Sequence, residues 1–205
     1  MIQRYVDAYI EDYNTDRIEL NQERIELFEY LEREIVPRLE SGEIYFNEKQ
    51  IDDCVGYIER WFFPLEPFQK FLIPFIFLYF KKNNLIVYRK FLYMMARGAG
   101  KNGLISGVAS FLLTPMHGVK NYNISIIANS EDQAKTSFHE IYTVIEENAK
   151  LERLFYKTKS EILSRQTKSI IKFRTSNGNT KDGLRDGAVI FDEIHQYESN
   201  RDVRV

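Results

Sequence analysis

The sequence is poor in cysteine and in long apolar runs, and each shortage excludes a class of protein. Cys54 is the one cysteine among 205 residues, which excludes an internal disulfide and a cysteine-rich zinc site and fits a reducing compartment. The most apolar run, residues 71–80, is half as long as a bilayer-spanning helix and contains Pro74. Residues 1–14 are acidic and lack the apolar core of a signal peptide. We therefore expect a globular protein with no membrane partner, in which residues 71–80 form a buried helix.

Net charge is small, but it is distributed unevenly along the chain. Residues 1–60 hold 16 acids and 7 bases, a balance of −9, whereas residues 61–205 hold 14 acids and 21 bases, a balance of +7. One interpretation is a solvated acidic helical face beside an ordinary core. The other is a mildly basic surface suited to phosphate-rich partners. Charge alone does not decide between them.

The first third of the chain has the apolar spacing of helices. Within residues 16–40, apolar side chains recur every three or four positions, as on one face of an amphipathic helix. Asn47 with Gln50 predicts the N-cap of a second helix, and a third is expected to begin after Pro67. We predict a helical N-terminal appendage over residues 1–60.

From residue 91 onward, short apolar runs alternate with helical patterns. Helices are predicted after Lys101 and from Ser130 to about Glu147. The runs with the length and composition of strands are residues 91–96, 123–128, 169–175 and 188–193. Alternating strands and helices with near-continuous apolar strands predict an α/β fold, with a mostly parallel central sheet flanked by helices.

The segment ARGAGKN, residues 96–102, follows the first predicted strand and opens a helix. Gly98, Ala99 and Gly100 can turn backbone N–H groups toward an anion, and Lys101 can reach the outer phosphates of a nucleotide. The usual phosphate-loop pattern has an earlier glycine, where this chain has Met95, and ends in Ser or Thr, where it has Asn102. The alternative is a tight strand–helix turn with an exposed lysine.

A second motif, AVIFDE, places two acids at the end of an apolar strand. Asp192 can hold Mg²⁺, and Glu193 can act as the general base that polarises an attacking water. The alternative is a structural pair that is satisfied by nearby cations. The two motifs in this order favour a phosphate loop, in which the Asn102 amide oxygen is a further candidate Mg²⁺ ligand and Arg97 grips a phosphate bidentately.

Four segments in the same order resemble the ATPase domain of the large terminase subunit, the motor that packages DNA into tailed-phage capsids. The resemblance covers residues from about 45 to 198. It is carried by EPFQKFLIPF, ARGAGKN, IIANSEDQAK and DGLRDGAVIFDEIH. It implies that Gln69 contacts the adenine edge of ATP. It also implies a P-loop NTPase fold with Walker A and Walker B motifs.

The resemblance further implies the domains and partners of the protein. Residues 61–205 would form the ATPase core, cut off before the family's coupling motif and nuclease domain. ATP and Mg²⁺ would be the cofactors. Double-stranded DNA, the phage portal and the small terminase subunit would be partners, in the cytoplasm of the infected bacterial host. The full-length protein would form a ring homo-oligomer, and this fragment would be mostly monomeric.

Two other functions stay open at this stage. One is a helicase-like nucleic-acid ATPase with the same core, and the other is a nucleotide-binding docking module without turnover. His195 could sense the γ-phosphate or simply bond to a neighbouring loop, and His117 and His139 are expected at the surface. The candidates for an arginine finger acting on a neighbouring subunit are Arg165, Arg174 and Arg185.

Overall fold

The computed structural model describes residues 1–96, 98–128, 131–175 and 185–192, without the side chains of residues 131–134 and 175. The chain forms two compact units, which are described separately. The first comprises residues 1–59 and 64–94, and the second comprises residues 60–63 and 95–205. These units divide the chain at other positions than the predicted boundary at residue 60. None of the helices in the described ranges combines the length and apolarity that crossing a bilayer requires.

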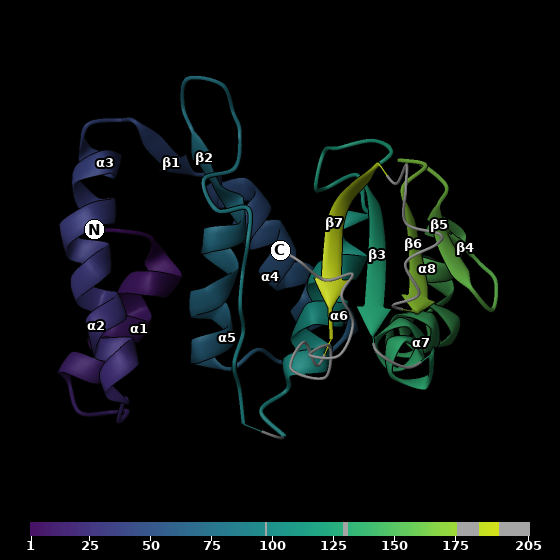
Figure 1. Ribbon diagram of the computed structural model, residues 1–205, viewed down its shortest axis with the longest axis horizontal. Helices are drawn as coiled ribbons and strands as arrows, with labels where there is room; N and C mark the ends of the chain where they lie inside the picture. Colours follow the sequence, from purple (N-terminus) through teal and green to yellow (C-terminus); the bar gives the residue numbers. More distant parts are fainter. Residues whose placement is uncertain (97, 129–130, 176–184, 193–205) are drawn as a thin grey trace. The chain divides into compact units, whose positions relative to one another are not determined.

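The first unit is mainly helical, as the sequence predicts. Asn21 accepts a hydrogen bond from the Arg24 N–H at the start of α2, and the predicted cap at Asn47 accepts one from the Gln50 N–H. The elements, coloured purple to blue-green in Figure 1, are α1 (Arg4–Asn14), α2 (Gln22–Tyr30), the π-helical turn η1 (Leu31–Ile35), α3 (Val36–Glu40), β1 (Ile44–Phe46), α4 (Glu48–Trp61), α5 (Pro67–Leu72), the 3₁₀ turn η2 (Ile73–Phe77) and β2 (Leu78–Phe80).

The prediction that residues 71–80 form a buried helix is wrong beyond Leu72. The α-helix ends at Leu72, and a 3₁₀ turn carries the chain into β2. Pro74 explains the change, because it lacks the N–H that a continuing α-helix would use. Strand β2 pairs antiparallel with β1, opposing Leu78 to Phe46. The apolar run is still buried, since Ile73, Phe77 and Leu78 are at most 1% exposed.

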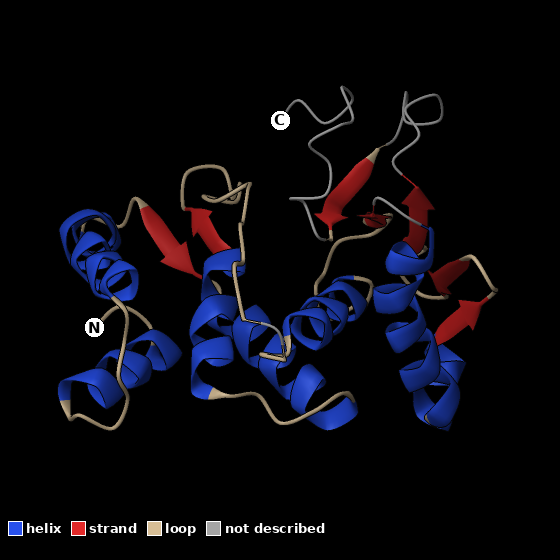
Figure 2. Ribbon diagram, turned by 60° about the horizontal axis from the view of Figure 1, so that its bottom comes forward, coloured by secondary structure: helices blue, strands red, loops and turns tan. Residues whose placement is uncertain are grey.

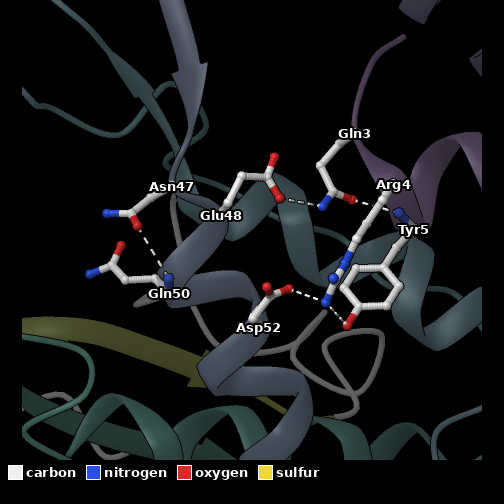
Figure 3. A network of polar contacts seen from close by, with 7 residues as sticks. All are labelled: Gln3, Arg4, Tyr5, Asn47, Glu48, Gln50 and Asp52. Carbon is white, nitrogen blue, oxygen red and sulfur yellow. Dashed lines mark hydrogen bonds and ion pairs between the residues drawn. The ribbon is translucent and has the colours of Figure 1, made fainter.

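Polar contacts fasten the first residues of the chain to α4 (Figure 3). The Gln3 Nε2 amide donates to Glu48 Oε2 at 2.8 Å, and Gln3 Oε1 accepts from the Tyr5 N–H as the N-cap of α1. Arg4 forms an ion pair with Asp52 one turn further along α4. These bonds tie α1, which the sequence pattern does not predict, to a helix more than 40 residues away in sequence.

The second unit holds a five-stranded sheet with the order β4-β5-β6-β3-β7 (Figure 1). Strand β3 lies between β6 and β7 and is parallel to both, with Ile126 opposite Phe173 and Ile190. The elements are α6 (Lys101–Leu112), β3 (Asn123–Ala128), α7 (Glu131–Glu147), α8 (Ala149–Leu154), β4 (Phe155–Lys157), β5 (Glu161–Ser164), β6 (Ile170–Thr175) and β7 (Asp186–Phe191).

The predicted α/β fold is confirmed, with one departure in the sheet. Strands β4 and β5 form an antiparallel hairpin that adds to the β6 edge, so the sheet is mixed. Helix α7 packs on β3 and β6, with Phe138 in edge-to-face contact with Phe173, and α6 packs beside α7 (Figure 2). Apolar side chains buried on this face of the sheet form the core of the second unit. Ile124, Ile126 and Ile171 are at most 1% exposed.

The strand predicted over residues 91–96 does not form. This segment makes no ladder with any strand of the described residues, and Phe91, Leu92 and Met94 are 40%, 70% and 84% exposed. An apolar run becomes a strand only when a neighbouring strand satisfies its N–H and C=O groups. The chain therefore reaches the glycine-rich segment in an irregular conformation.

Candidate nucleotide-binding site

A tight glycine turn leads into α6. Gly98 and Gly100 have φ angles of +86° and +75°, a left-handed conformation that residues with a side chain adopt only with strain. The Ala99 N–H donates to the Ala96 carbonyl, and the Gly100 carbonyl accepts the first helical bond, from Leu104. Gly100 is thus the N-cap of α6. The turn leaves the N–H groups of the first helical residues available to an anion.

Lys101, the first residue of α6, reaches the end of β7. Its Nζ lies 3.1 Å from Asp192 Oδ1, and the two side chains are 24% and 7% exposed. Both motif residues that the sequence singles out are therefore brought together in the second unit. The predicted alternative of a solvent-exposed lysine is wrong, because Lys101 points toward the buried carboxylate. An anion on Lys101 and a cation on Asp192 would meet at this point.

Asp192 is held by the sheet itself. Its N–H donates to the Ile127 carbonyl of β3 at 3.0 Å, which continues the parallel ladder one residue beyond β7. Asp192 Oδ1 is buried and has no hydrogen-bond partner, so its contact with Lys101 is an ion pair without hydrogen-bond geometry. A buried carboxylate oxygen in this condition is costly unless a cation balances it.

The residues present fit a magnesium ion. Asp192 Oδ1 is a hard oxygen ligand lacking a hydrogen-bond donor, and Asn102 follows Lys101 on the first turn of α6. Mg²⁺ commonly takes only one or two protein oxygens, with water and substrate phosphates completing its shell. Across the described residues, no group of three or more acidic, histidine or cysteine side chains gathers at one point. Asp192 and Asn102 would supply the one or two protein oxygens that a phosphate-bound Mg²⁺ takes.

Two glycines that the sequence interpretation did not single out are required by close packing. A Cβ on Gly103 would lie 2.8 Å from the ring of Phe63, next to the loop. A Cβ on Gly187 of β7 would lie 2.4 Å from the ring of Tyr122. Neither requirement is visible in a local pattern, because both depend on an aromatic ring from a distant part of the chain.

His117 is buried, which corrects the prediction that it lies at the surface. It is 5% exposed, its Nδ1–H donates to the Leu112 carbonyl at 2.9 Å, and its ring meets Tyr122 edge-on at 4.6 Å. Burial lowers the pKa of His117, and the bond to Leu112 opposes that shift only in part. Through Tyr122 and Gly187, His117 links the C-terminal end of α6 to the start of β7. His139 is exposed, as predicted.

Gln69 belongs to the first unit, where it is 3% exposed in α5. Its Oε1 accepts from the Glu66 N–H at 3.0 Å, and the Glu66 side chain accepts from the Gln69 N–H, a reciprocal capping box. A contact with adenine would use the Gln69 amide Nε2, or would require this cap to open. The adenine role of Gln69 stays a prediction.

Two of the three arginine-finger candidates already have structural partners in the second unit. Arg165 Nε donates to the Phe155 carbonyl, and Arg174 Nε donates to Ser125 Oγ at 3.0 Å. Ser125 in turn donates to Asp186 Oδ2 at 2.6 Å. Arg185 is exposed just before β7. The predicted roles of Arg97, Glu193 and His195 fall outside the described residues.

A glycine turn, a lysine at the start of the following helix and an aspartate at a strand end together have the arrangement expected of a P-loop. The family model for the ATPase domain of the terminase large subunit matches residues 67–204. The chain therefore belongs to the terminase large subunit ATPase family, as its four motifs suggest.

A solved structure supports the same assignment. The crystal structure of the HK97 bacteriophage large terminase is similar to this chain with 27% sequence identity and a TM-score of 0.62. The match covers 72% of this chain and 32% of that one, so the chain spans about a third of the length of the protein it matches. No curated protein matches the sequence.

Proposed function

We propose that this chain hydrolyses ATP to drive double-stranded DNA into a phage capsid. The observation that carries the proposal is the contact between Lys101 and Asp192, which joins the phosphate loop to the strand-end acid. Membership of the terminase ATPase family supports ATP as the nucleotide, and the likeness to a phage large terminase supports DNA packaging as the work done.

The backbone and the side chains of the loop would have different tasks. The N–H groups of Gly98 and Gly100 would hold phosphate oxygens, joined by the Ala99 N–H once it leaves its bond to the Ala96 carbonyl, and Lys101 would neutralise the outer phosphates. Arg97 adds a bidentate contact to a phosphate. Backbone donors and a fixed cation stabilise the charge of the transferring phosphoryl group without reorganising during the reaction.

Asp192 and Asn102 would hold Mg²⁺, which would supply positive charge against the phosphate oxygens of the nucleotide. Glu193 would accept a proton from the attacking water as its oxygen bonds to the γ-phosphorus and the bond from that phosphorus to ADP breaks. Gln69 would contact the adenine edge. When the nucleotide enters, Lys101 exchanges its carboxylate partner for phosphate oxygens, and Asp192 becomes available to the metal.

The wider setting follows from the same assignment. The portal and the small terminase subunit would be partners, and the full-length protein would work as a ring in the cytoplasm of the infected host. No nuclease activity is proposed for the residues of this chain. A helicase-like ATPase would share the site but would use ATP to move along nucleic acid in a process other than packaging. A docking module would bind nucleotide without turnover.

The test is phosphate release measured with and without double-stranded DNA. A DNA-translocating ATPase should release phosphate from Mg-ATP, and duplex DNA should increase the rate, whereas a docking module should release none. The Lys101→Ala variant controls for contaminating ATPases. Stimulation by single-stranded but not double-stranded DNA would favour the helicase-like function and overturn the packaging assignment.

A further inference from the structure

Phe63 lies beside the first turn of α6, close to the phosphate loop. Its ring atoms Cε1 and Cζ lie 2.8 Å and 3.2 Å from the position that a Cβ on Gly103 would occupy. Both residues belong to the second unit, so this contact lies within one compact part of the chain. Because Gly103 lacks a side chain, the tip of the Phe63 ring reaches the backbone of the helix that follows the loop.

The Phe63 ring is half-buried, and it meets α6 through its edge. The ring atoms nearest to Gly103 are at the tip of the ring and do not belong to one of its faces alone. In the part of the chain that the structure describes, no aromatic ring and no cationic side chain stacks on Phe63. A ring that serves only as core is packed closely by its neighbours. The partial exposure of Phe63 instead suits contact with a planar ligand.

The geometry of α6 gives the direction in which a bound nucleotide would run. Lys101, which would hold the outer phosphates, and Gly103 are two residues apart, so they lie roughly 200° apart around the helix axis. The N–H groups of the first helical residues have no acceptor inside the helix and can hold the phosphates between these two sides. A triphosphate that crosses this end of α6 from Lys101 would therefore have its nucleoside on the side of Phe63.

A carboxylate beside the ring also favours a nucleoside over a phosphate at this position. Glu140 Oε1, from α7, lies 3.4 Å from the same Cβ position at Gly103. A carboxylate repels phosphate oxygens, whereas the base and the ribose of a nucleotide carry no charge. An aromatic ring at such a place is suited to a base, because every base has a face on which an aromatic side chain can stack.

We propose that the Phe63 ring stacks on the base of the bound nucleotide. The proposal rests on the proposed function for the presence of a nucleotide at the loop, and it adds a residue that contacts the base. Stacking on a ring face does not read the hydrogen-bonding edge of the base, so Phe63 serves ATP and GTP alike. Selection of adenine then depends on edge contacts, such as the one proposed for Gln69.

The experiment compares two variants of the full chain with the same chemical change. Phe63→Leu removes the aromatic face and keeps an apolar side chain, and Phe75→Leu makes the same change at a half-buried ring of the first unit. Isothermal titration measures the binding of Mg-ATP, Mg-GTP and magnesium tripolyphosphate, which has the phosphates without a base. Melting temperatures without ligand show whether each variant is folded.

Phe63→Leu should bind Mg-ATP and Mg-GTP at least about fivefold more weakly, since one base–aromatic stack is worth a factor of roughly 5 to 150. Its affinity for tripolyphosphate, and every affinity of Phe75→Leu, should match those of the parent. Unchanged binding of both nucleotides by Phe63→Leu would overturn the proposal. An equal loss for tripolyphosphate would also overturn it, because the ring would then only support the loop.

A second variant tests the contact by fluorescence and does not depend on a loss of affinity. Trp61 is the one tryptophan of the chain, so Phe63→Trp made together with Trp61→Phe moves the only indole to position 63. Mg-ATP and Mg-GTP should quench the emission of this variant by stacking, whereas magnesium tripolyphosphate should leave it unchanged. Emission that neither nucleotide changes, although both bind, would contradict the proposal.

Phosphate release separates this inference from the proposed function. Phe63→Leu should raise the KM for ATP with little change in kcat, because the stack is present in the ground state and in the transition state. If binding depends on Phe63 as predicted but the parent releases no phosphate from Mg-ATP, the proposed function fails and this inference stands. If the parent releases phosphate and Phe63→Leu does so with the same KM, this inference fails alone.

Discussion

At the scale of single residues, the contact between Lys101 and Asp192 controls how the site responds to substitution. Asp192 is almost fully buried, so removing Lys101 leaves its charge poorly compensated. Breaking a buried pair on one side costs about 3–5 kcal/mol in measured cases. A loss of stability must therefore be separated from a loss of nucleotide binding in every variant of these two residues.

The first prediction concerns Lys101. Lys101→Ala should abolish the thermal stabilisation that Mg-ATP gives the parent, because a charge-assisted contact of about 1.5–3 kcal/mol is lost. Differential scanning fluorimetry with and without Mg-ATP measures the effect. Lys101→Ala combined with Asp192→Asn removes both charges and should recover stability without recovering ATP binding. Equal stabilisation of the parent and Lys101→Ala by Mg-ATP would refute the phosphate-binding role.

The second prediction separates the two acids. Glu193→Gln should keep the affinity for ATP and lower hydrolysis by at least 10²-fold, because general-base catalysis is worth about 10²–10⁴ in rate. Asp192→Asn should instead weaken the magnesium-dependent part of binding. Isothermal titration and phosphate release distinguish the two outcomes. Hydrolysis at the parental rate in Glu193→Gln would assign the base to another group.

The residues of this site differ in how far the sequence could predict them. Lys101 and Asp192 stand in local motifs whose chemistry implies their meeting, and the structure brings them within 3.1 Å. Gly187 and His117 could not be predicted, because each is fixed by Tyr122, which touches both from a loop between α6 and β3. A local sequence pattern predicts which residues take part in the chemistry, whereas contacts between segments that are distant in sequence become apparent only in the folded structure.

At the scale of elements, α6 and β7 are connected at both ends. Lys101 and Asp192 join the start of α6 to the end of β7, and His117 with Tyr122 joins the end of α6 to the start of β7. A helix and a strand fixed at two points keep their relative position. The phosphate loop and the strand-end acid are thereby held in register.

The third prediction uses the titration of His117. Burial lowers its pKa, so below about pH 6.5 the unfolded chain binds the proton more readily than the folded chain does. The stability contributed by neutral His117 is present above that pH and should decrease as pH falls. Melting temperature measured from pH 7.5 to 5 should fall less steeply in His117→Gln, while exposed His139→Gln should follow the parent. Identical slopes in all three proteins would contradict the prediction.

The sequence pattern predicts an element well when its signals lie within that element, and poorly when the element depends on pairing with another segment. The Asn47 cap and the apolar face of α4 predict that helix correctly, since both signals lie within one element. Residues 91–96 have the composition of a strand but form none, because no described strand pairs with them. The sequence pattern does not predict the hairpin of β4 and β5, because its strands have only three and four residues.

At the scale of the whole molecule, the final prediction concerns assembly and turnover. Phosphoryl-transfer sites of motors are often completed by an arginine from a neighbouring subunit, which adds about 10³–10⁵ in rate. Arg165 and Arg174 are engaged within their own unit. Without such a neighbour, the chain should hydrolyse ATP well below about 1 s⁻¹. We also predict that it sediments mostly as a monomer and cuts no DNA.

Analytical ultracentrifugation, phosphate release and plasmid nicking with Mn²⁺ test the three parts of this prediction separately. A concentration-dependent rise in both sedimentation coefficient and turnover would show that this chain forms its own ring contacts. Nicking that survives Asp192→Ala would place a nuclease inside these residues, against the assignment of that activity to a further domain.

The ion pair between Lys101 and Asp192 also means that a carboxylate of the protein competes with ATP for the Lys101 ammonium group. The Asp192 carboxylate and the γ-phosphate are both oxyanions, and each seeks the same ammonium group. The observed affinity for ATP is then the intrinsic affinity divided by one plus the equilibrium constant for the internal pair. A divalent cation that captures the carboxylate removes this competitor at the moment the phosphate arrives. Magnesium and nucleotide should for that reason bind cooperatively, even if the two made no direct contact with each other.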